Sequence, residues 1–100
     1  MFKWLDTKNA EAFGVEMAKM VKEMVPSDSS VNESKRASKA NYSKEKMQKR
    51  INQFKESENL NFYKLAKLLN AFKWELKDAG YEAKISDSLS AWLLTTLRAK

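Results

Sequence analysis

The sequence predicts an all-α fold, a small antiparallel four-helix bundle with one long basic helix. Its 100 residues include only two glycines and one proline, whereas β-rich folds need many tight turns, which favour these residues. Apolar residues recur at spacings of three and four along most of the chain, as in helices with one buried face. Apolar residues make up 43% and charged residues 32% of the chain. We therefore expect one soluble helical domain spanning residues 1–100.

The first helix is predicted from about Asn9 to Val25. Its apolar face consists of Ala10, Phe13, Met17, Met20 and Met24. Thr7 or Asp6 can cap its start, and Pro26 ends it. Gly14 lies beside the apolar face and costs about 1 kcal/mol of helix propensity relative to alanine. We therefore expect another helix to approach closely at this glycine.

The second helix is predicted from about Val31 to Ser57, after a turn at residues 26–30. Ser30 and Glu33 have the spacing of a capping box at its start. Its apolar seam consists of Ala37, Ala40, Lys44, Met47, Ile51 and Phe54. Because only the second half of this seam carries large apolar side chains, we expect residues 31–42 to be more loosely ordered than the rest.

Two further helices are predicted in the second half of the chain. Asn59 or Asn61 can cap the third helix, and Gly80 suits a left-handed C-terminal cap. The apolar face of the third helix consists of Phe62, Leu65, Leu68, Leu69, Phe72, Leu76 and Ala79. Residues 81–85 alternate in polarity, which is compatible with a short extended segment. Ser86 or Asp87 then caps the last helix, whose inward residues are Leu89, Trp92, Leu93 and Leu97.

The positive charge is concentrated in the second helix. The net charge is +6, and residues 34–55 hold eight basic residues and one acidic residue, against 11 basic and 12 acidic residues elsewhere. A helical wheel places one stripe opposite the Met47–Phe54 seam, formed by Lys35, Lys39, Tyr42, Lys46, Lys49 and Arg50. Like charges four residues apart oppose helix formation. The stripe is therefore a candidate surface for DNA or RNA phosphates, with Tyr42 stacking on a base, or for an acidic protein. The alternative is a solvated helix face.

A second candidate surface lies on the third helix. Tyr63 and Trp74 fall opposite its main apolar face, with Leu60 nearby, and Leu94 lies on the polar side of the last helix. Either another part of the chain covers these residues, such as the apolar segment 1–5, or they form an interface with a protein partner or a second copy. Tyrosine and tryptophan are typical anchors of such interfaces.

Catalytic chemistry is not predicted. The chain has no cysteine and no histidine, which removes the thiolate nucleophile and the imidazole base. Acidic pairs such as Glu75 and Asp78 lie among lysines on polar faces, and no phosphate-binding glycine loop is present. We therefore expect no catalytic, cofactor or metal site.

The sequence predicts a cytoplasmic protein without membrane contact. No apolar run approaches the roughly 20 residues of a membrane helix, and the N-terminus lacks the apolar centre of a signal peptide. The predicted function is a non-enzymatic interaction module that self-associates as a homodimer or binds a protein partner. The alternative is non-specific nucleic-acid binding through the basic stripe.

Overall fold

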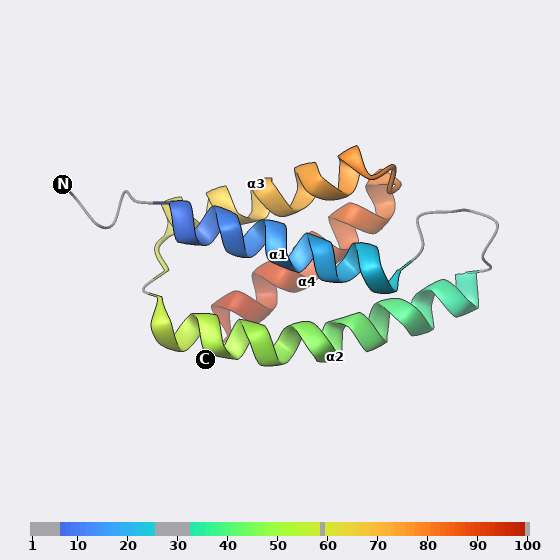
Figure 1. The fold of residues 1–100 in the computed structure, drawn as a ribbon, viewed down its shortest axis with the longest axis horizontal. Coiled ribbons are helices and arrows are strands. Elements are labelled where there is room, and N and C mark those ends of the chain that lie inside the picture. Colours follow the sequence, from blue (N-terminus) through green and yellow to red (C-terminus); the bar gives the residue numbers. More distant parts are fainter. Residues whose placement is uncertain (1–6, 26–32, 59, 100) are drawn as a thin grey trace.

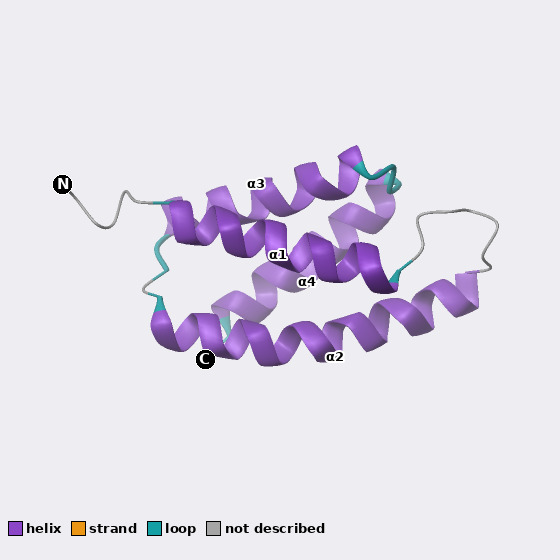
Figure 2. Cartoon of the chain, in the orientation of Figure 1, coloured by secondary structure: helices purple, strands orange, loops and turns teal. Residues whose placement is uncertain are grey.

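The computed structural model describes residues 7–25, 33–58 and 60–99. These ranges contain four helices, α1 (Lys8–Met24), α2 (Glu33–Ser57), α3 (Phe62–Asp78) and α4 (Ala83–Arg98). Consecutive helices run in opposite directions (Figures 1 and 2), and the predicted small all-α four-helix bundle is confirmed. The predicted turn at 26–30, the capping serine Ser30 and the segment 1–5 lie outside the described residues.

The bundle consists of two helical hairpins packed on each other. The α1–α2 hairpin lies against the α3–α4 hairpin so that α1 packs on α3 and α2 packs on α4. The most extensive contact is between α1 and α3, which run in the same direction (Figure 1). Within the described ranges, α2 and α3 do not pack on each other. The outer faces of α2 and α3 therefore lie on opposite sides of the molecule (Figure 1).

All four helices contribute to one apolar core. Its largest fully buried side chains include Met17, Met47, Ile51, Leu68, Phe72 and Leu93. The rings of Phe13 and Phe54 stack between α1 and α2, with centroids 4.0 Å apart. Gly14 is buried at the α1–α3 crossing, where a Cβ would lie 2.3 Å from the backbone oxygen of Leu68. The close helix approach predicted at this glycine is confirmed.

The predicted caps of α3 are present at both ends. The Asn61 side chain accepts a hydrogen bond from the Lys64 amide at 2.8 Å. At the other end Gly80 has a φ of 88°, the left-handed region that glycine tolerates. The Tyr81 amide donates to the Leu76 carbonyl at 3.1 Å and the Gly80 amide donates to the Lys77 carbonyl at 3.0 Å, which is the Schellman pattern.

The start of α4 differs from the prediction. Residues 81–85 are not an extended segment, because α4 already begins at Ala83 with Glu82 at the N-cap position. Ser86 lies inside the first turn, where its Oγ donates to the Ala83 carbonyl at 3.1 Å. The physical reason is the burial of Tyr81, whose hydroxyl donates to the Val25 carbonyl at the end of α1. With the Tyr81 side chain buried against the end of α1, the chain forms α4 only two residues later, from Ala83 onward.

Two further sequence predictions are wrong in detail. Phe62 was assigned to the buried face of α3 but is 80% exposed, because the core sector follows Leu65, Leu68, Phe72 and Leu76. Thr7 occupies the predicted N-cap position of α1 but does not cap the helix through its side chain, and the alternative cap, Asp6, lies outside the described residues. Its hydroxyl instead donates to the Glu11 carboxylate at 2.9 Å.

Candidate functional site

The basic side chains of α2 whose burial the structure describes divide into an outward and an inward set. The outward set is exposed and comprises Lys35, Lys39, Lys46 and Lys49. The inward set is half-buried and comprises Lys44, Arg50 and Lys55. Only the outward set is placed to meet a ligand, because each member of the inward set contacts another part of the fold.

Arg50, a predicted member of the basic stripe, contacts α1 in the structure. Its Nε lies 2.6 Å from one carboxylate oxygen of Glu16, and its terminal nitrogen lies 3.1 Å from the other. The guanidinium also lies 5.5 Å from the centre of the Phe13 ring. This two-point contact with α1 pairs the charge of Arg50, and its predicted part in the binding stripe stays a prediction.

The side chains of Lys55 and Lys44 both contact α4. The Lys55 ammonium donates to the Thr96 carbonyl at 3.2 Å and to the Ala99 carbonyl. These carbonyls stand at the C-terminal end of α4, where the helix dipole favours a positive charge. The Lys44 ammonium lies 5.7 Å from the centre of the Trp92 ring. Both cations therefore contribute to the α2–α4 contact.

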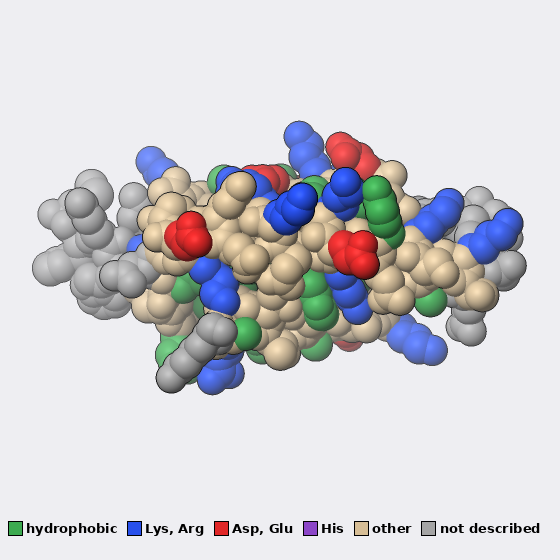
Figure 3. All heavy atoms as spheres, turned by 90° about the horizontal axis from the view of Figure 1, so that it is seen from below, with side chains coloured by type: hydrophobic (Ala, Val, Ile, Leu, Met, Phe, Trp, Pro, Cys, Tyr) green, Lys and Arg blue, Asp and Glu red, His purple; other side chains and the backbone are tan. Residues whose placement is uncertain are grey.

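The remaining stripe is called here the α2 outer row and consists of Lys35, Lys39, Tyr42, Lys46 and Lys49. It extends for about 21 Å, at about 1.5 Å per residue. Figure 3 looks at the molecule from the α2 side and shows basic side chains along this whole face, with acidic side chains among them. Among the α2 side chains that the structure describes, the exposed acids are Glu45 and Glu56, which a helical wheel places on the flank of the row.

Tyr42 stands in the middle of the α2 outer row. Its side chain is 54% exposed, and the Lys46 ammonium lies 5.5 Å from the ring centre. An open hollow of about 350 Å³ beside it is lined by Met24, Ser38, Lys39 and Tyr42. An aromatic ring, cations and an adjoining space are thus brought together at one place.

The outer face of α3 carries the second surface, called here the α3 ridge. It consists of Tyr63, Lys67, Asn70 and Trp74, which share one helix face. Tyr63 is 45% and Trp74 is 63% exposed, so the described part of the chain leaves both largely uncovered. The Lys67 ammonium lies 5.8 Å from the Tyr63 ring centre, and the Lys77 ammonium lies 5.7 Å from that of Trp74. The alternative cover, the segment 1–5, lies outside the described residues.

Leu60 and Leu94 do not join the α3 ridge as exposed interface residues. Both are half-buried and pack against the apolar core. Both therefore contribute to core packing, and their predicted part in a partner interface stays a prediction. The ridge therefore depends on its two aromatic side chains.

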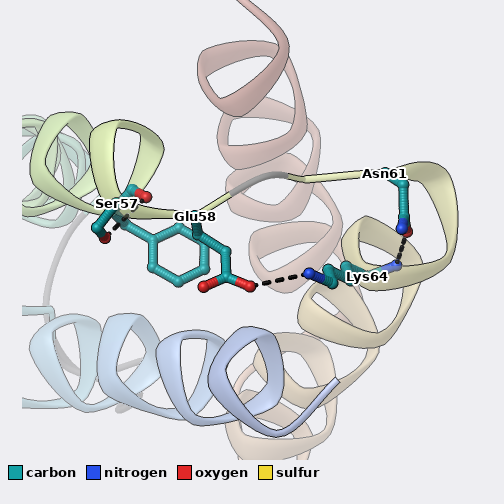
Figure 4. Close-up of polar contacts among 5 residues, drawn as sticks. Ser57, Glu58, Asn61 and Lys64 are labelled. Atoms are coloured by element: carbon teal, nitrogen blue, oxygen red, sulfur yellow. Dashed lines mark hydrogen bonds and ion pairs between the residues drawn. The ribbon is translucent and has the colours of Figure 1, made fainter. Parts of the chain in front are cut away.

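The sequence did not indicate the buried ion pair between Glu58 and Lys64. The Lys64 ammonium lies 3.0 Å from a Glu58 carboxylate oxygen, with side-chain exposures of 7% and 16%. Figure 4 shows the pair reaching across the connection between α2 and α3, beside the Asn61 cap. No spacing rule joins residues six positions apart across a turn, so no signal in the sequence could have found it. The pair links the two ends of the connection between α2 and α3, and each charge has a partner of opposite sign.

No group of three or more histidine, cysteine, aspartate or glutamate side chains within the part of the chain that the structure describes is placed to hold a metal ion. Likewise, none of the helices in the described ranges is both long enough and apolar enough to cross a bilayer.

Comparison with known proteins identifies no relative of this chain. No family model matches the chain, and neither curated proteins nor solved structures include a significant match. What the protein does is therefore inferred from its own side chains.

Proposed function

We propose that the protein is a non-enzymatic interaction module that associates with a second copy of itself through the α3 ridge. The observation that carries this proposal is the exposure of Trp74 and Tyr63, at 63% and 45%, on one face of a well-packed helix. Large aromatic side chains of this kind dominate the energetics of protein interfaces when a partner desolvates them. Trp74 also borders a groove of about 300 Å³ between α3 and α4, which offers space for a partner side chain.

The order of residues along the α3 ridge suits a second copy as the partner. A two-fold interface brings the same surface from both chains together, so residue i meets residue j and j meets i. If two α3 helices meet antiparallel, with the axis midway between Lys67 and Asn70, then Tyr63 of each copy faces Trp74 of the other. Lys67 then faces Asn70, and the ridge lysines do not meet each other. The ridge is self-complementary in this arrangement.

Sedimentation equilibrium over a range of protein concentrations tests this proposal. We expect a concentration-dependent dimer that the double variant Tyr63→Ser/Trp74→Ser weakens at least tenfold. Tyr42→Ser is the matched control, because Tyr42 is 54% exposed and lies on the opposite side of the molecule. The proposal fails if the protein remains monomeric throughout, or if the ridge variant and the control dimerise equally well.

A further inference from the structure

We propose that the α2 outer row is a binding site for single-stranded nucleic acid, with phosphates on Lys39, Lys46 and Lys49 and one base stacked on Tyr42. This site lies opposite the α3 ridge and does not depend on self-association. Lys35 extends the same row towards the start of α2.

The charge of the row is not explained by the needs of the fold. Arg50, Lys44 and Lys55 already supply the contacts of α2 with α1 and α4. By contrast, Lys39, Lys46 and Lys49 are exposed and form no ion pair with another described residue. Like charges at helical spacing weaken their own helix slightly. A ligand that carries a row of negative charges would convert this cost into binding affinity.

The composition of the row favours a polyanion over an acidic protein. Protein interfaces are anchored by apolar and aromatic side chains in a core from which charged residues are depleted. The α2 outer row offers one aromatic ring and no aliphatic side chain between its cations, so most of its attraction must be electrostatic. Cations interleaved with a stacking aromatic are typical of surfaces that bind single strands without sequence preference.

Tyr42 is the feature that favours a single strand over a duplex. Its exposed ring and the adjoining hollow of about 350 Å³ offer a base both a stacking surface and space. In a duplex the bases are paired and stacked inside, so only an unpaired base can lie on this ring. The Lys46 ammonium lies over one face of the ring, 5.5 Å from its centre, so the base would stack on the other face.

Fluorescence anisotropy of the full chain with a labelled 20-nucleotide oligothymidine tests the site. Three or four phosphate contacts predict that the logarithm of the affinity falls with the logarithm of salt concentration with a slope of about −2 to −3. We expect Lys39→Glu/Lys46→Glu to lower the affinity at least tenfold and Tyr42→Ser to lower it by about tenfold. A 20-base-pair duplex should bind more weakly than the single strand.

Lys19→Glu/Lys84→Glu is the matched control, because it changes the net charge equally at two exposed lysines that belong neither to the α2 outer row nor to the α3 ridge. It should leave the affinity for the oligonucleotide within about threefold, and sedimentation of the same samples separates any loss of self-association from a loss of binding. The site is excluded by absence of binding at low salt or by equal effects of the two double variants. The site is also excluded if two results are found together: the duplex binds as tightly as the single strand, and Tyr42→Ser does not change the affinity for the single strand. Equally effective competition by polyglutamate would show a general polyanion surface and would likewise overturn the proposal.

Discussion

Gly14 and Leu68 set the distance between α1 and α3. A Cβ on Gly14 would lie 2.3 Å from the backbone oxygen of Leu68 and 3.2 Å from the Cβ of Ala71. The first contact is with backbone, so no side-chain rotation can relieve it. The two helices that form the most extensive contact of the bundle can therefore approach to this distance only when residue 14 has no Cβ.

The variant Gly14→Ala is expected to destabilise the protein by about 1 to 3 kcal/mol, the usual cost of overpacking a filled interior. Helix propensity alone predicts the opposite sign, because alanine is favoured over glycine by about 1 kcal/mol inside a helix. Urea denaturation of the variant and the wild type decides between these effects. A more stable Gly14→Ala variant would show that the helices can move apart without cost.

Tyr81 links the α3–α4 turn to the end of α1, and its loss has a pH-dependent signature. Tyr81→Phe leaves the Val25 carbonyl without this donor, so we expect a loss of about 1 to 3 kcal/mol at neutral pH. Burial raises the pKa of the Tyr81 hydroxyl above its ordinary value of about 10. The folded protein therefore holds this proton more tightly than the unfolded chain does.

The Tyr81 contribution is constant below pH of about 10 and falls as the pH rises above it, because the unfolded chain then loses the proton first. The free energies of unfolding of wild type and Tyr81→Phe should accordingly converge at alkaline pH. The difference between the two free energies of unfolding at each pH is free of the contribution of the lysines, because that contribution is common to the two proteins. A difference that stays constant up to pH about 11 would contradict this account.

The buried pair Glu58–Lys64 should respond strongly to the loss of one partner. Lys64→Met leaves the Glu58 carboxylate unpaired at 16% exposure, and breaking a buried pair in this way costs about 3 kcal/mol or more. Adding Glu58→Gln should recover part of that loss. The exposed pair Lys73–Asp87, at 45% and 62% exposure, is the control, and Lys73→Met should cost less than about 1 kcal/mol. Equal losses for the two lysine variants in thermal denaturation would exclude a special role for the buried pair.

Apart from the close helix approach at Gly14, the parts of the fold that were predicted correctly are those encoded by neighbouring residues. Asn61 and Gly80 act at the helix ends where they stand, and the Met47–Phe54 seam follows helical spacing. The start of α4 was missed because a long-range contact, that of Tyr81 with Val25, overrides the local capping preference of Ser86. Local signals therefore suffice for the existence of each helix but not for all of its ends.

The candidate surfaces were predicted to the extent that a helical wheel allows. The wheel gives the direction of each side chain from its own helix, and Tyr63 and Trp74 are indeed exposed where it placed them. It does not show where neighbouring helices lie. Arg50 stands at the edge of the stripe that faces α1, and only the packed bundle brings Glu16 within reach of it.

Arg50 and Lys49 are adjacent in sequence, and the structure predicts opposite consequences for their loss. Arg50→Gln removes the contact with Glu16, a half-exposed pair worth about 0.5 to 1 kcal/mol, and should leave oligonucleotide affinity within about twofold. Lys49→Gln should leave the free energy of unfolding within about 0.5 kcal/mol of wild type. It should lower the affinity for the oligonucleotide and reduce the magnitude of the salt slope by about 0.7.

Denaturation and anisotropy on the same two variants check this division. Glu16→Gln is a useful companion, because it breaks the same contact without changing α2 and should reproduce the stability loss of Arg50→Gln. If Arg50→Gln lowers the affinity for the oligonucleotide as much as Lys49→Gln does, then Arg50 leaves Glu16 to contact a phosphate in the complex. In that case the inward and outward cations of α2 form one surface, and the separation by burial does not hold in the complex.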